Sequence, residues 1–185
     1  DVSMLDCQIA ILENAIARYL SKNEIPEPMG SRHPSIAPFE AFKTKDSYII
    51  IAAGNDKLFA KLCDVLKIPE ASNDERFNSN SLRCENMDQL KEIFEKQLNS
   101  KTTNEWVEEM EALKIPCGPI FNIKQAVENP QVQERNMIVK SYHKIIGEFK
   151  SAGNPIKMST YKDENTRGDI PDLDEHREKI IKEFS

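Results

Sequence analysis

The segment Gly30-Ser31-Arg32-His33 is the first place in the chain where the residue types suggest chemistry. A glycine-containing loop ahead of a strand can bring backbone N–H groups against an anion, with Arg32 or His33 beside them. The same residues also suit an ordinary linker turn. We therefore treat Gly30, Ser31, Arg32 and His33 as candidate substrate-binding residues.

The segment Gly54-Asn55-Asp56 follows the apolar run Tyr48–Ala53. A turn from a strand into a helix can place an amide or a carboxylate at the mouth of a cleft, which makes Asn55 and Asp56 candidate cleft residues. A simpler interpretation is that Asn55 caps the next helix, because asparagine is a preferred N-cap residue. The residue types alone favour capping.

A third segment, Pro116-Cys117-Gly118-Pro119, contains a thiol. A nucleophilic cysteine needs a base or a positive charge that lowers its pKa, and no histidine is close in sequence. Each proline fixes φ and the glycine permits a sharp turn, so we interpret Ile115–Ile120 as a rigid connector.

The rest of the composition excludes several classes of function. The four cysteines and three histidines are scattered, which predicts no metal site and favours a reducing, intracellular compartment. The net charge of -6 disfavours nucleic acid, because binding to phosphates normally requires a basic excess. No apolar run approaches the ~20 residues that span a bilayer, so we expect no membrane partner.

The periodicity of apolar residues predicts an α+β fold in which helices outnumber strands. Aromatic and β-branched residues on either side of a polar turn predict two strand pairs, 36–42 with 48–53 and 137–142 with 145–150. Helices are predicted over residues 2–21, 55–66, 86–98, 102–113, 122–127 and 174–184. The helix at 102–113 begins with the capping-box pattern Thr102-Thr103-Asn104-Glu105.

Three runs in this order resemble class III coenzyme A transferases over nearly the whole chain. They are DVSMLDCQIAILENAIARYL, GSRHPSIAPFEAFKTKDSYIIIAAGNDKLFAKLCDVL and IPCGPIFNIKQAVENPQVQERNMIV. Asp172-Leu173-Asp174-Glu175-His176 extends the resemblance, although family members usually have glycine where Asp174 stands. The chain starts at Asp1 without a methionine, and we expect it to be the C-terminal half of such an enzyme.

The resemblance implies how the chain is divided. Residues 1–35 would be a helix and linker from a Rossmann-like large domain, and residues 36–130 the small domain. Residues 131–185 would return to the large domain and end in a helix packed on it. The resemblance also implies a homodimer of interlocked full-length chains, with the active site between the domains.

The chemistry that the resemblance implies begins with an aspartate, whose carboxylate attacks an acyl-CoA thioester. In the family this residue lies upstream of the DVSMLD-type segment, so we expect it outside this chain, upstream of residue 1. The catalytic residues in this chain are therefore unknown, and the isolated chain is predicted to be inactive. The substrates would be a coenzyme A thioester and a small carboxylic acid, with no bound cofactor, in the cytoplasm or the mitochondrial matrix.

Residues Gly30–His33 correspond to the glycine-rich loop that covers the reacting carboxylate in the family. Several relatives have consecutive glycines there, so the single glycine of this chain predicts a stiffer and more polar loop. Two alternatives remain open. An acyl-CoA racemase of the same fold would use a small-domain carboxylate near Asp56 in an acid–base pair, and a chain without a nucleophile could be a non-catalytic assembly module.

Overall fold

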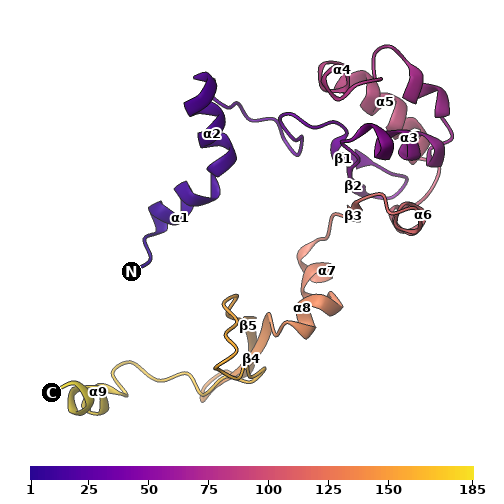
Figure 1. Cartoon of the computed structure of the whole chain (residues 1–185). Coiled ribbons are helices and arrows are strands. Elements are labelled where there is room, and N and C mark those ends of the chain that lie inside the picture. Colours follow the sequence, from indigo (N-terminus) through magenta and orange to yellow (C-terminus); the bar gives the residue numbers. More distant parts are fainter. The chain divides into compact units, whose positions relative to one another are not determined.

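The structure, a computed structural model, describes all of residues 1–185 (Figure 1). The chain forms two compact units, Asp1–Ile120 and Phe121–Ser185. Nine α-helices and two small antiparallel sheets make up an α+β fold, as the sequence predicted. None of the helices has both the length and the apolar character that a membrane crossing requires.

The first unit contains a three-stranded sheet in the order β1-β2-β3. The predicted hairpin is confirmed as β1 (Phe39–Lys43) and β2 (Tyr48–Ala52). The predicted connector is wrong in part, because β3 (Cys117–Pro119) pairs antiparallel with β2. As the last strand in the sheet order, β3 has one side without a partner strand, which is where a sheet tolerates proline.

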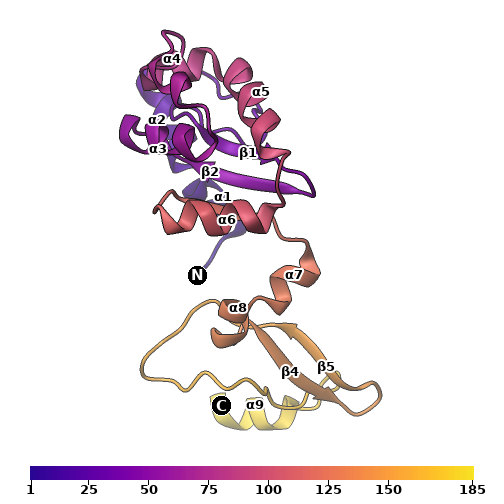
Figure 2. The same ribbon diagram turned by 90° about the vertical axis from the view of Figure 1, so that its right-hand side faces the viewer.

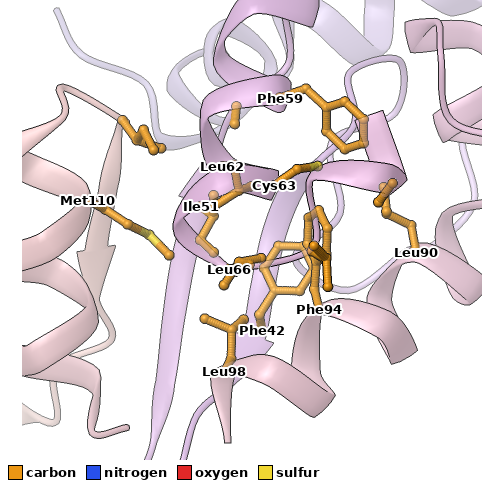
Figure 3. Packing of buried hydrophobic residues seen from close by; sticks show 14 of the residues in the cluster. Phe42, Ile51, Phe59, Leu62, Cys63, Leu66, Leu90, Phe94, Leu98 and Met110 are labelled. Atoms are coloured by element: carbon orange, nitrogen blue, oxygen red, sulfur yellow. The ribbon is translucent and has the colours of Figure 1, made fainter. Parts of the chain in front are cut away.

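Helices pack their apolar faces against this sheet. The helical elements are α3 (Asp56–Val65), the 3₁₀ helix η1 (Pro69–Asn73), α4 (Asn80–Glu85), α5 (Met87–Leu98) and α6 (Thr103–Ala112). Helix α5 lies along β1 and α6 along β2 (Figure 2). Helix α6 also contacts β3. The core between them is fully buried and includes Phe42, Ile51, Phe59, Leu62, Cys63, Leu66, Leu90, Phe94, Leu98 and Met110 (Figure 3).

Two predicted helix caps are confirmed in this unit. The Asn55 side chain accepts a hydrogen bond from the Leu58 amide at 2.9 Å, and Thr102 and Glu105 form a reciprocal capping box. The turn between β1 and β2 also supports α6, because the Thr103 amide donates to Asp46 Oδ1 at 2.8 Å. These contacts use N–H groups that a helix N-terminus otherwise leaves without partners.

The single helix predicted over residues 2–21 is two helices, α1 (Met4–Ile11) and α2 (Glu13–Lys22). The break falls at Leu12, whose N–H bonds the Ile9 carbonyl three residues earlier rather than four. A tightened turn of this type interrupts the α-helical pattern without a proline or glycine. Neither helix has a buried residue.

The second unit contains a β-hairpin, β4 (Ile138–His143) with β5 (Gly147–Ala152), which confirms the second predicted strand pair (Figure 2). It also contains α7 (Ile123–Glu128), α8 (Pro130–Glu134) and α9 (Arg177–Phe184). The last helix begins three residues later than predicted, because Asp174 has a φ of 68° and cannot belong to a right-handed helix. This left-handed conformation favours glycine, although aspartate also adopts it.

Candidate functional site

The two candidate segments of the first unit lie at the same end of the β1–β2 hairpin. Gly30–His33 leads to Phe39, the first residue of β1, and Gly54–Asp56 follows Ala52, the last residue of β2. Phe39 and Ala52 are opposite each other in the sheet. The antiparallel pairing therefore brings together residues that are more than twenty positions apart in sequence.

Hydrogen bonds and packing fix both segments to this end of the hairpin. The His33 amide donates to the Phe39 carbonyl at 2.9 Å, and the His33 ring stacks on Phe39 with centroids 5.2 Å apart. On the other side, the Ala53 amide donates to the Pro38 carbonyl at 2.9 Å.

A groove of about 450 Å³ lies at this place. Its walls are mainly apolar, with two amide side chains and no charged group; its lining residues are Ile36, Phe39, Ala52, Gly54, Asn55, Leu58 and Asn80. A smaller hollow of about 130 Å³ is lined by Arg32 and His33 among others, and Ile36 lines both. Residues from both candidate segments thus border neighbouring hollows.

The glycines of the two segments meet different requirements. Gly30 has a φ of 66°, and a β-carbon there would have no other atom within 4 Å, so the glycine is needed for its backbone conformation. Gly54 has an ordinary φ, but a β-carbon there would lie 1.9 Å from Ile36 Cγ2. Gly54 is therefore needed for the close packing of Ile36 beside the groove.

The polar side chains of the Gly30–His33 loop are tied to neighbouring elements. Arg32 Nε donates to Glu40 Oε1 at 2.9 Å, and Arg32 Nη2 donates to Asp88 Oδ1 at 2.7 Å. Ser31 Oγ accepts from the Ala41 amide at 3.0 Å. Glu40 is only 3% exposed and also forms an ion pair with Lys91.

These ion pairs determine the charge that Arg32 offers to a ligand. The hydrogen bond from Arg32 lowers the pKa of Asp88, and the same bond raises the pKa of Arg32. Arg32 is therefore a cation already paired with two carboxylates. Since the amides of Arg32 and His33 already donate to the Met29 and Phe39 carbonyls, an anion near the loop would meet the Gly30 and Ser31 amides and a largely neutralised Arg32 side chain.

The turn residues Asn55 and Asp56 have structural partners. Asn55 caps α3, as the simpler interpretation predicted. Asp56 Oδ1 accepts from Arg83 Nη2 at 2.8 Å, although the Asp56 side chain is 73% exposed. Sequence reasoning missed Arg83, which is fully buried, because an arginine in a short polar segment is ordinarily solvated.

The cysteines show no sign of nucleophilic activation. Burial raises the pKa of the Cys117 thiol, and it raises the pKa of Cys63 to about 12. All four cysteines are free thiols, and no group of His, Cys, Asp or Glu side chains is arranged to hold a metal ion. Cys117 therefore packs in β3 as a small apolar side chain.

Comparisons with known proteins show similarity to CoA-transferases over almost the whole chain. Residues 1–177 match CoA-transferase family III. The acetyl-CoA:oxalate CoA-transferase of Acetobacter aceti is 38% identical over 185 residues, which are all of this chain and 46% of that protein. The human succinyl-CoA:glutarate CoA-transferase is 33% identical over 183 residues, which are 99% of this chain and 42% of that protein.

The fold of the chain is also similar to that of a solved structure. A crystal structure of a CAIB/BAIF family protein from Brucella suis superimposes with a TM-score of 0.75 and 31% identity, and the match covers 97% of this chain and 46% of that one. The chain thus spans just under half the length of the relatives that it matches. With residues 1–177 matched and the α+β fold shared, the chain belongs to CoA-transferase family III.

Proposed function

We propose that this chain is the C-terminal part of an enzyme that moves coenzyme A from an acyl-CoA donor to a carboxylic acid acceptor. The observation that carries the proposal is the family match over residues 1–177. Its support is that the similar proteins are named as CoA-transferases with acetyl-CoA or succinyl-CoA as donor and oxalate or glutarate as acceptor.

The proposed reaction proceeds through an aspartate that lies outside this chain. Its carboxylate attacks the thioester carbonyl and forms a mixed anhydride, and CoA leaves as the thiolate. The thiolate attacks the aspartyl carbonyl of the anhydride, which releases the donor acid and leaves an aspartyl-CoA thioester. The acceptor carboxylate then attacks that thioester, which expels the CoA thiolate and forms a second mixed anhydride between the aspartate and the acceptor. The thiolate attacks the acceptor carbonyl of this anhydride, which gives the acceptor acyl-CoA and frees the aspartate carboxylate.

This chain would contribute the wall of the site that faces the reacting groups. Within the Gly30–His33 loop, the amides of Gly30 and Ser31 remain available, because those of Arg32 and His33 bond the Met29 and Phe39 carbonyls. Backbone N–H groups stabilise negative charge that develops on a carbonyl oxygen. The groove is uncharged and largely apolar, which suits the carbon skeleton of a substrate rather than its carboxylate.

The proposal includes the architecture that the family resemblance implies. Residues 1–35 and 131–185 would belong to the large domain, and residues 36–130 would form the small domain. Two full-length chains would interlock as a homodimer, in the cytoplasm or the mitochondrial matrix. The racemase alternative receives less support, because the Asp56 carboxylate that it requires is engaged in an ion pair with Arg83.

The test compares the complete protein with the isolated 185-residue chain. Each is incubated with acetyl-CoA or succinyl-CoA and a panel of acids that includes oxalate, glutarate and mesaconate, and new acyl-CoA is measured by liquid chromatography. We expect turnover only from the complete protein. Intact-mass measurement during turnover should show the mass of the aspartyl-CoA thioester. Turnover by the isolated chain would contradict the proposed place of the nucleophile.

A further inference from the structure

Arg83 is the largest buried side chain that the proposed mechanism does not yet use. It lies in α4 with an exposed fraction of 0%. Its Nε donates to the Ala37 carbonyl at 2.8 Å, and its Nη1 donates to the Phe77 carbonyl at 3.0 Å. Its guanidinium carbon also lies 4.5 Å from the centroid of the Phe59 ring.

The third nitrogen of Arg83 reaches the turn that follows β2. Nη2 donates to Asp56 Oδ1 at 2.8 Å and lies 3.5 Å from the Gly54 carbonyl. Ala37 belongs to the segment that leads from the Gly30–His33 loop into β1, whereas Gly54 and Asp56 form the turn after β2. One guanidinium therefore joins the Gly54–Asp56 turn to the segment that follows the Gly30–His33 loop.

Asn80 holds the first of these segments from the same short helix. Its Oδ1 accepts from the Ala37 amide at 3.0 Å, and its Nδ2 donates to the Ser35 carbonyl at 2.9 Å. Asn80 and Arg83 are three residues apart and so lie on one face of α4. Helix α4 thus fixes residues 35–37 through Asn80 and joins them to the turn through Arg83.

A buried cation is an expensive way to obtain stability alone. Desolvation of a buried ion pair is often not recovered, and an apolar replacement of similar volume can be as stable. What an arginine provides is a planar set of N–H donors in fixed directions. Those directions match acceptors on separate segments. The guanidinium therefore fixes the positions of these segments relative to each other.

We propose that Arg83 is a positioning residue that holds residues 35–37, which lead from the Gly30–His33 loop into β1, at a fixed separation from the Gly54–Asp56 turn on the other side of the groove. The role in catalysis rests on the proposed function, because it requires that the groove border the active site. Asp56 is the counter-ion of Arg83 in this arrangement. Its carboxylate stabilises the guanidinium in its buried position.

The first experiment measures backbone hydrogen exchange in the complete protein with Arg83→Lys. Lysine keeps the charge but cannot bond several diverging acceptors at once. We expect exchange to become at least about 10-fold faster in residues 34–39 and in residues 53–58 together, while β4 is unchanged. The control is Arg76→Lys, because Arg76 is half-exposed and bonds Asp74 and Gln89 instead.

The second variant, Asp56→Asn, covers the case in which Arg83→Lys does not fold. Asp56 is exposed and lies at the first turn of α3, so the amide should be accommodated. Loss of the only carboxylate partner of Arg83 should raise exchange in the same two segments by a smaller factor. Faster exchange in one segment only, or in neither, would overturn the proposal.

The kinetic experiment separates positioning from binding. Arg83→Lys should lower kcat by at least about 10-fold and leave KM for the acyl-CoA within about 3-fold, at a temperature where circular dichroism shows the variant folded. An unchanged kcat with both segments loosened would overturn the role in catalysis. If the wild-type complete protein transfers no CoA, the proposed function fails, whereas the exchange experiment still decides whether Arg83 joins the segments.

Discussion

Two sets of helices with apolar side chains in this chain have opposite environments. Helices α3, α5 and α6 bury their apolar faces, whereas α1, α2 and α9 contain no buried residue. Leu62 of α3 has an exposed fraction of 0%, and Ile9 of α1 has one of 51%. The spacing of apolar residues nevertheless predicted helices in both sets.

The difference teaches that amphipathic spacing identifies the face to be covered but not what covers it. For α3, α5 and α6 the cover is the core of the first unit. Each large aliphatic side chain left exposed forgoes ~1.5–3 kcal/mol of burial, and contiguous apolar patches mark interfaces. We predict that α1, α2 and α9 pack on the large domain, and that the isolated chain self-associates or holds its ends loosely.

The largest expected effect is in hydrogen exchange of the isolated chain. Amides around Tyr48–Leu66 should exchange more than about 1,000-fold more slowly than those of residues 2–21 and 174–184 in the monomer, because core amides open only with global unfolding. Uniform protection in a monodisperse monomer would show that the end helices complete a self-contained domain. The proposed division of the chain would then be wrong.

The next effect concerns single phenylalanines in the two sets of helices. Phe94 of α5 is fully buried, with its ring centroid 5.8 Å from that of Phe42 and 6.2 Å from that of Phe59. Phe94→Ala should lower the free energy of unfolding by about 3–5 kcal/mol. The control Phe184→Ala, at an 82% exposed position, should change it by less than about 0.5 kcal/mol in urea titrations of the isolated chain.

A comparable decrease in the free energy of unfolding for Phe94→Ala and Phe184→Ala would mean that the Phe184 side chain is buried in solution. Analytical ultracentrifugation of both variants would then distinguish self-association from packing within one chain. A smaller oligomer for Phe184→Ala, compared with the wild-type chain, would assign the cover to a second copy.

A smaller effect is expected from the two glycines with positive φ. Gly30 and Gly147 have φ values of 66° and 76°, and a β-carbon added at either glycine would have no other atom within 4 Å. Gly30→Val in the complete enzyme should lower kcat by at least ~10-fold, about 1.4 kcal/mol of barrier, with the fold intact. Gly147→Val imposes the same backbone strain in the β4–β5 hairpin and should leave kcat unchanged.

Equal losses of kcat in both variants would mean that strain alone reduces activity. An unchanged kcat in Gly30→Val would mean that the Gly30–His33 loop is an ordinary linker turn with no role in catalysis. Circular dichroism of each variant provides the check that the fold is intact.

Local patterns were enough to predict much of the fold. The two hairpins and the caps at Asn55 and Thr102 follow from neighbouring residues, so the sequence predicted them correctly. Strand β3 was missed because its pairing depends on β2, more than sixty residues earlier, and its prolines suggested a turn. The left-handed Asp174 was missed because aspartate also suits the start of a helix, which is where the sequence pattern placed it.

The candidate site shows the same limit. Gly30–His33 and Gly54–Asp56 were found by residue type, and the hairpin register places them at one end of the sheet. Arg83 was not found, because its acceptors on Ala37 and Gly54 are backbone carbonyls that lie 46 and 29 residues away in sequence. Backbone acceptors have no residue type that a sequence pattern could reveal.

The smallest expected effect is a difference between the two units in how their stability depends on pH. Hydrogen bonding to the backbone of Thr103 lowers the pKa of Asp46 in the first unit, and the hydrogen bond from Lys157 lowers that of Asp163 in the second unit to about 2. A carboxyl whose folded pKa is depressed contributes stability above its unfolded pKa of about 3.9 and loses it as pH falls through the folded value. The single tryptophan, Trp106, lies in α6 and reports unfolding of the first unit. Asp46→Ala should therefore lower the urea midpoint of Trp106 fluorescence at pH 7 and reduce its dependence on pH below about 4. Asp163→Ala should leave the urea midpoint of Trp106 fluorescence unchanged, both at pH 7 and below about pH 4. A shift of that midpoint as large as the shift for Asp46→Ala would show that the two units unfold together.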